Sequence, residues 1–156
     1  MSITVRLQAE IFDPGKESNA FLETAEKSGI ARGTGAMVTF TGLVRSCAKA
    51  PIISMTLEHY PPLAQAQLTR FAQKAIVRFD LFAIAIIHRF GEMKPGEPIV
   101  QVMALAPHRR AAFGGAEFVM DFLKTDAPFW KKELSKTGAS WVAAKSNDDD
   151  ARARWQ

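Results

Sequence analysis

The chain has 156 residues, of which 47% are hydrophobic, and a formal net charge of +4. This length and composition predict one domain, residues 1–156, with enough apolar side chains for a core. No apolar run is long enough to cross a bilayer, and the N-terminus lacks the pattern of a signal peptide. A single cysteine, Cys47, excludes an internal disulfide. We therefore expect a cytoplasmic protein, and its excess of positive charge suits anionic partners.

Patterns in the first half of the chain predict three strands and two helices. Residues 3–11 alternate between apolar and polar side chains, which is the period of a half-buried strand. A short helix is expected over 18–27, and β-branched residues predict a second strand over 36–44. A third strand, 52–60, stops at two prolines, which suit the first turn of a second, amphipathic helix.

The second half of the chain predicts three more strands and a long helix. Residues 82–90 are nearly all apolar, as in a central strand that is buried on both faces. A turn over 91–96 leads into another strand over 99–106. A helix follows over 111–126, and the last strand is expected over 140–144.

The order of these elements, β-α-β-β-α-β-β-α-β, predicts the fold class. It implies an α+β domain with a mixed or antiparallel sheet and about three helices. The apolar stripe of the long helix is expected to bury Phe113. The tail, residues 146–156, combines acidic residues with two arginines and is expected to fray or to dock last.

A proline separates two lysines near the C-terminal end of the long helix. Pro128 disfavours helical angles at the residue before it, so the helix should end near residue 126 or 127. A second short helix is then expected, with Pro128 in its first turn. The break would let Lys124 and Lys131 approach one site from two directions. The apolar pair Phe129-Trp130 at this corner must pack on something.

Several signatures of known chemistries are absent from the sequence. It has no glycine-rich phosphate loop, no dinucleotide fingerprint and no nucleophile elbow. The three histidines have no metal-ligand spacing with the one cysteine, so no metal site is expected. His59 and His88 lie in predicted strands and are interpreted as buried, structural histidines.

Cations at the ends of predicted elements are the remaining candidates for chemistry. Arg45 follows a strand, His108 and Arg109 follow another, and Lys124 and Lys131 follow in the next segment. If these groups converge, they form an anion site in which a lysine could act as a nucleophile or as a general acid and base. On spacing alone, solvated surface charges are the simpler reading for each of them.

An ordered set of segments nevertheless resembles the large, catalytic subunit of molybdopterin synthase, the MoaE family. The segments together run from about Gly35 to Ala144. They are Phe40-Thr41-Gly42-Leu43-Val44-Arg45, Leu57-Glu58-His59-Tyr60-Pro61, His88-Arg89-Phe90-Gly91, Pro95-Gly96-Glu97, His108-Arg109-Arg110-Ala111-Ala112-Phe113, Asp121-Phe122-Leu123-Lys124-Thr125, Ala127-Pro128-Phe129-Trp130-Lys131-Lys132-Glu133 and Trp141-Val142.

The resemblance implies a hammerhead-type α+β fold and a homodimer of large subunits, each with one small subunit, which makes a heterotetramer. The small partner is ubiquitin-like and ends in Gly-Gly with a thiocarboxylate. Its tail delivers two sulfurs in succession to cyclic pyranopterin monophosphate (precursor Z), and so makes the dithiolene of molybdopterin. The implied activity is that of a sulfurtransferase in molybdenum cofactor biosynthesis, and it needs no metal or organic cofactor.

The resemblance also assigns site residues. It makes Lys124 the principal catalytic lysine and Lys131 the second. The substrate-binding residues that it implies are Phe40, Leu43, Val44, Arg45, His108, Arg109, Lys132 and Glu133. The sequence departs from the family in a short loop after Arg45, in Asp126, which could pair with a nearby lysine, and in the pair Gly114-Gly115.

Three other readings stay open at this stage. The positive charge and the aromatic residues near cations would suit a module that binds nucleic acid. Cys47 could be the nucleophile of a cysteine-dependent transferase, although no base is adjacent to it in the sequence. A homologue that binds a ubiquitin-like tail without reacting with it is the third.

Overall fold

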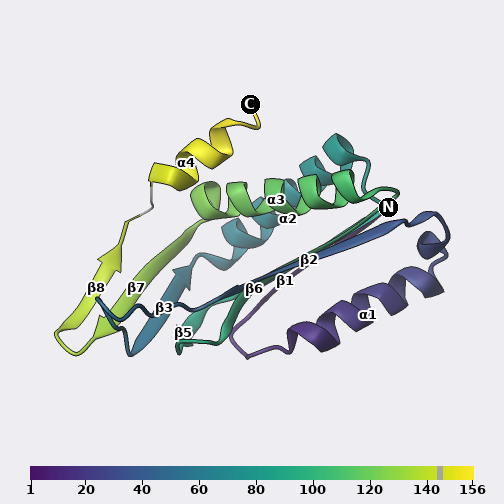
Figure 1. Cartoon of the computed structure of the whole chain (residues 1–156). Coiled ribbons are helices and arrows are strands. Elements are labelled where there is room, and N and C mark those ends of the chain that lie inside the picture. The colour runs from purple at the N-terminus through teal and green to yellow at the C-terminus, as the bar shows by residue number, and fades with distance from the viewer. Residues whose placement is uncertain (144–145) are drawn as a thin grey trace.

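The computed structural model describes residues 1–143 and 146–156 (Figure 1). In chain order the elements are β1 (Ser2–Gln8), α1 (Pro14–Lys27), a 3-10 turn η1 (Ile30–Gly33), β2 (Ala36–Leu43), β3 (Ser54–His59), α2 (Pro61–Phe79), β4 (Ala83–Arg89), β5 (Gly91–Met93), β6 (Pro98–Ala106), α3 (Arg109–Asp126), β7 (Phe129–Ser135), β8 (Gly138–Val142) and α4 (Ser146–Ala153).

The first sheet is mixed and has the strand order β1-β4-β6-β2. Strands β1 and β4 are parallel, whereas β4 and β2 both run antiparallel to β6. Helices α2 and α3 cover one face of this sheet and α1 covers the other (Figure 1). All seven residues of β4 are buried, so the prediction of a central apolar strand is confirmed.

The second sheet has the order β5-β3-β7-β8 and is antiparallel. Its strand β7 occupies the place where the sequence predicted a short helix after Pro128, and that prediction is wrong. Ala127 is extended, as expected before a proline, with φ −73° and ψ 136°. The chain then pairs with β3 on one side and β8 on the other, because two rows of ladder hydrogen bonds outweigh the weak local preference for a helix.

A hairpin signal accompanies this strand in the sequence. Phe129 and Trp130 favour strands, and the turn at Lys136 and Thr137 is followed by Gly138 at φ +126°, where a glycine is favoured. The same sheet includes β5, which lies in the stretch that the pattern assigned to a turn.

Helix α3 packs closely on the end of α2. A Cβ on Gly114 would lie 2.8 Å from Phe79, and one on Gly115 would lie 2.7 Å from Leu81, so the glycine pair permits this approach. Phe113 points away from the contact and is 62% exposed. The prediction that Phe113 is buried is therefore wrong.

The C-terminal helix α4 lies on α3 (Figure 1). Asp121 accepts hydrogen bonds from Arg154 at 2.8 Å and from the indole of Trp155 at 2.6 Å. Arg152 donates to Asp126 at 2.8 Å, so Asp126 pairs with an arginine of α4 and not with a lysine. These contacts fix α4 to the helix that carries Lys124.

The α+β class predicted from the sequence is confirmed, with two differences in detail. The strands form two sheets, and the described residues contain four α-helices where about three were expected. Within the described part of the chain, no helix has the length and apolar character needed to span a membrane.

Candidate functional site

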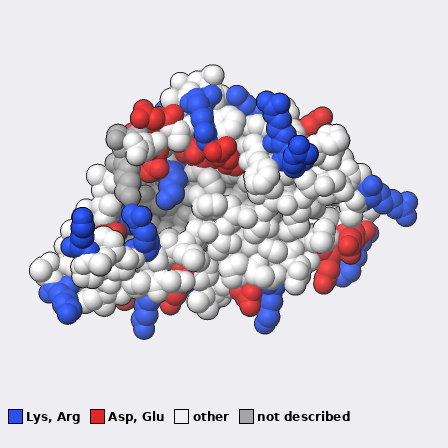
Figure 2. Space-filling view, viewed as in Figure 1, with Lys and Arg blue, Asp and Glu red and all other residues white. Residues whose placement is uncertain are grey.

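A cavity of about 580 Å³ lies between the two sheets, below the C-terminal end of α3. Figure 2 shows this face hollowed below α4, with basic side chains at the rim. The described residues that line the cavity come from six strands, two helices and the chain beside them. They are Phe40, Gly42, Leu43, Met55, Leu57, His88, Ile99, Val100, Met120, Leu123, Lys124, Ala127, Phe129, Trp130, Lys131, Trp141, Val142, Ala143 and Asp148.

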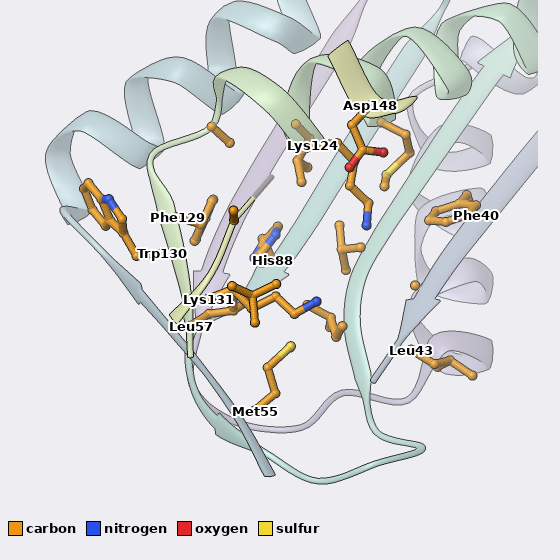
Figure 3. Close-up of a pocket in the computed structure, with 18 of the residues that line it drawn as sticks. Phe40, Leu43, Met55, Leu57, His88, Lys124, Phe129, Trp130, Lys131 and Asp148 are labelled. Atoms are coloured by element: carbon orange, nitrogen blue, oxygen red, sulfur yellow. The ribbon is translucent and has the colours of Figure 1, made fainter. Parts of the chain in front are cut away.

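Two lysines reach this cavity from different elements. Lys124 lies in the last turn of α3, and Lys131 lies on β7 beyond the break at Pro128. Figure 3 shows both side chains directed into the same space. Their predicted convergence is thus confirmed, although a strand and not a second helix carries Lys131.

Two lysines and one aspartate are the charged side chains in the described lining of the cavity. Lys131 is 3.5 Å from the carboxylate of Glu133, two residues along the same face of β7. Asp148, in the first turn of α4, supplies the single carboxylate among the described lining residues, and Figure 3 shows it beside Lys124. The lining side chains alone carry one net positive charge, and two ammonium groups directed into a largely apolar space suit an anion, although Glu133 offsets part of the charge of Lys131.

The rest of the cavity wall is largely apolar. Met55 and Leu57 of β3 lie on one side, and Met120 and Leu123 of α3 lie on another. A concave apolar site with a few convergent charged groups is typical of ligand-binding sites. The low polarity of such a wall strengthens the electrostatic interactions of the two lysines.

His88 lies in the wall of this cavity as a buried, neutral side chain. His88 is only 3% exposed, and this burial lowers the pKa of its imidazole from 6.5 to about 4. The charges of His59 and Lys124 also lower this pKa, by smaller amounts. The ring of His88 stacks on Phe129, with centroids 4.0 Å apart. The prediction that it is buried is confirmed, but its place in the cavity wall was not foreseen.

His59 belongs to the same stack of rings. It lies between Phe90, at 4.2 Å, and Phe129, at 5.8 Å between ring centroids. Burial lowers its pKa as well. His59 is half-buried and not fully buried as predicted, and it is not among the residues that line the cavity.

The predicted substrate-binding segment at the end of β2 is divided between the cavity and the core. Phe40 and Leu43 line the cavity, and both are partly exposed. Val44 is buried against Met55 and others in a separate apolar cluster. Arg45 is exposed and lies outside the lining of the cavity.

His108 and Arg109 lie far from the two lysines within one chain. They are at the N-terminal end of α3, and both are exposed. Lys124 is fifteen positions after Arg109 in the helix, which corresponds to about 22 Å. Of the five cations considered from the sequence, the structure brings together two.

The remaining predicted residues lie near the cavity or apart from it. Lys132 places its ammonium 5.5 Å from the ring centroid of Trp141, and this ring lines the cavity. Cys47 is exposed in the loop after β2 and is not a lining residue. In the described residues there is no group of three or more histidine, cysteine or acidic side chains that could hold a metal ion.

Sequence reasoning missed His88 and Asp148 as members of the site. Because β4 is buried along its whole length, its sequence pattern does not show which face of the strand opens onto a cavity. Asp148 lies in the tail, and only the packing of α4 on α3 brings it to the lysines.

Comparisons with known proteins agree with the resemblance of the sequence. A family described as MoaE protein matches residues 8–126. The molybdopterin synthase catalytic subunit of Rhizobium meliloti (strain 1021) is 48% identical over 155 residues, which are 98% of this chain and 96% of that protein.

Solved structures share the fold. The molybdopterin biosynthesis MoaE protein from Burkholderia ambifaria MC40-6 is 41% identical, with a TM-score of 0.77 over 98% of this chain and 97% of that one. A more distant chain, from a protein–protein complex of subunits 1 and 2 of molybdopterin-converting factor from Helicobacter pylori 26695, is 19% identical, with a TM-score of 0.65. The match covers 92% of this chain and 90% of the Helicobacter pylori chain, and the two chains have the same fold.

Proposed function

Because the chain belongs to the MoaE protein family, we propose that it is the catalytic subunit of a molybdopterin synthase. It transfers sulfur from the thiocarboxylated C-terminus of a small ubiquitin-like subunit to cyclic pyranopterin monophosphate. The observation that carries this proposal is the convergence of Lys124 and Lys131 in one largely apolar cavity. The acyl thiolate and the cyclic phosphate are both anionic, and two ammonium groups suit them.

The cavity divides the work between its two lysines. Lys131 orients the thiocarboxylate and offsets its charge. The sulfur attacks a carbon of the pterin side chain, so that a carbon–sulfur bond forms, the carbon–oxygen bond at that carbon breaks, and the oxygen leaves with a proton. The acyl group remains attached to the sulfur. Water then releases the tail as a carboxylate, and Lys124 moves the protons of these steps or stabilises the charge that develops. Repetition with a second tail completes the dithiolene.

The substrate is held at the mouth of the cavity. Phe40 and Leu43 contact the pterin from β2, and the backbone of Val44 positions Arg45 beside it. Lys132 and Glu133 extend the binding surface along β7. Glu133 also holds Lys131, since the two side chains are 3.5 Å apart.

Two chains and two small subunits form the working assembly. Relatives with 48% identity are named catalytic subunits, which supports the presence of another kind of subunit in the enzyme. His108 and Arg109 lie about 22 Å along α3 from Lys124, so they serve the cavity of the partner chain in a homodimer. The assembly is a cytoplasmic heterotetramer, and the reaction uses no metal or organic cofactor.

Reconstitution tests the proposal. The purified chain is combined with a thiocarboxylated small subunit and precursor Z, and molybdopterin is measured. Formation of molybdopterin that depends on all three components is expected. If the chain binds the small subunit tightly but forms no product, it is a binder without catalytic activity, and the proposal is wrong. Salt-sensitive retardation of RNA or DNA without product would favour a nucleic-acid module instead.

A further inference from the structure

The hydrogen bond of His88 to the backbone determines which ring nitrogen carries its proton. Nδ1 lies 2.8 Å from the carbonyl oxygen of Arg89. A carbonyl oxygen only accepts hydrogen bonds, so Nδ1 carries the hydrogen and donates it. Because His88 is neutral, Nε2 has no hydrogen and presents a lone pair. Nε2 is then the nitrogen that remains free to accept a hydrogen bond from the cavity that His88 lines.

Acceptors are scarce among the side chains of this cavity. Lysine ammonium groups and tryptophan indoles only donate hydrogen bonds, and most other described lining side chains are apolar. The strong side-chain acceptors in the described lining are Nε2 of His88, on β4, and the carboxylate of Asp148, on α4. Figure 3 shows Asp148 beside Lys124, whereas His88 lies beside Phe129.

The surroundings keep His88 neutral and its ring in place. The stack on Phe129 fixes the plane of the ring. The charged or titratable groups around it are Lys124 from α3, Lys131 from β7 and His59 from β3, with Asp148 farther up on α4. The ammonium group of Lys124 opposes a positive charge on the ring.

A chain end that enters this cavity must find acceptors for its backbone N–H groups. An N–H that is buried without an acceptor loses its hydrogen bond to water, which costs free energy. The two lysines can meet the anionic terminus, but they cannot accept from an amide. We propose that Nε2 of His88 accepts a hydrogen bond from the last backbone amide of the small subunit's Gly-Gly tail.

This role rests on the proposed function and makes His88 a residue that contacts the sulfur donor. The bond holds the last glycine so that its acyl thiolate stays between Lys124 and Lys131. An amide has one hydrogen, so N-methylation of the last glycine removes the proposed bond and leaves the terminal carboxylate unchanged.

Paired peptides and variants test the proposal. A peptide ending in Gly-Gly and a matched peptide ending in Gly-sarcosine, both with a free carboxylate, are titrated into the protein. Binding is followed by the fluorescence of Trp130 and Trp141, which line the cavity. Wild type should bind the Gly-Gly peptide about fivefold more tightly, the size expected of one neutral hydrogen bond.

His88→Phe removes both ring nitrogens but retains an aromatic ring to stack on Phe129. It should bind the two peptides equally, and His88→Gln should restore part of the preference, because its amide oxygen can accept. His59→Phe is the matched control, since His59 is in the same stack but does not line the cavity. This control should keep the wild-type preference. Thermal unfolding of each variant verifies that it is folded.

Either of two results would overturn the inference. The first is that the wild-type protein fails to bind the Gly-Gly peptide or binds both peptides equally. The other is a folded His88→Phe variant that keeps the full preference. A wild-type preference together with failure to form molybdopterin in the reconstituted assay would instead leave this contact in place and contradict the proposed function.

Discussion

Lys124 and Lys131 line the same cavity, although one ends a helix and the other lies on a strand beyond a proline. The reversal between them is tight: the amide of Phe129 donates to the carbonyl of Ala127 at 2.8 Å, around Pro128. Strand β7 is then held on both sides by β3 and β8. The separation of the two ammonium groups is therefore set by the fold and not by a flexible loop, which suits preorganised charge stabilisation.

A mixed dimer tests the role assigned to the N-terminal end of α3. A dimer purified with one Lys124→Ala chain and one Arg109→Ala chain should recover about half of the wild-type rate, because one of its two cavities is then complete. Each variant alone should be strongly impaired. A rate in the mixed dimer no higher than in either parent would contradict the shared site.

The matched control for that experiment uses the second lysine. A mixed dimer of Lys124→Ala and Lys131→Ala chains has one lysine missing from each cavity, since both residues line the cavity of their own chain. It should show no recovery. Recovery here would mean that the lysines of the two chains combine in one site.

Acid should destabilise the protein between pH 6.5 and pH 4. Burial lowers the folded-state pKa of His88 from 6.5 to about 4, so the unfolded chain binds the proton more readily in this range. The contribution of His88 to the free energy of unfolding is fully present above pH 6.5. It is lost as the pH falls toward 4, and the loss is about 3 kcal/mol for this one group. His59, whose pKa is also lowered, contributes in the same direction.

Urea unfolding at pH 7 and at pH 5 measures this effect. His88→Phe should reduce the loss of stability between the two pH values, because no imidazole then gains a proton on unfolding. Glu97 has a lowered pKa, chiefly through its hydrogen bond from Arg89, so its contribution to stability is lost only as the pH falls below the ordinary value of 4.5. An unchanged pH dependence in the variant would show that His88 is not the source.

The docking of α4 depends on Trp155. Its ring packs edge-on against Phe79 and Phe118, with centroids 5.6 Å away in each case, and its indole donates to Asp121. Trp155→Ala should lower the free energy of unfolding by about 2 kcal/mol, the value of burying part of a large aromatic side chain. Hydrogen exchange in α4 should accelerate as well.

Replacing the neighbouring exposed residue, Gln156→Ala, is the control and should change neither quantity. In Trp155→Ala, where α4 is no longer docked, Asp148 should also lose its fixed position in the cavity wall. Equal exchange rates in α4 of wild type and Trp155→Ala would contradict the view that Trp155 holds the helix.

The sequence predicted most elements, because their patterns are local. Strand β4 is apolar along its whole length, and α2 begins at two prolines. The stretch after Pro128 could not be assigned in this way, since its strand is stabilised by pairing with β3, 70 or more residues earlier in the chain. Phe113 was placed on the wrong face because the glycines after it direct α3 onto α2.

The candidate site was predictable to a similar extent. The resemblance identified both lysines, and the structure confirms that they share a cavity. His88 was recognised as a buried histidine, but the opening of β4 onto a cavity depends on the arrangement of two sheets. His108 and Lys124 lie at opposite ends of α3, so the convergence considered for them from the sequence does not occur within one chain.

The rate of product formation by Lys124→Ala shows whether Lys124 takes part in the transfer of sulfur. Single-turnover formation of molybdopterin is measured with saturating thiocarboxylated small subunit, beside Lys136→Ala as a control for loss of a lysine. Lys136 is exposed in the turn between β7 and β8 and does not line the cavity. Lys124→Ala should be slower by a factor of at least ~100, the usual contribution of a positioned acid–base group, and Lys136→Ala should react at the wild-type rate. A Lys124→Ala variant that forms molybdopterin as fast as wild type would contradict the catalytic role of Lys124.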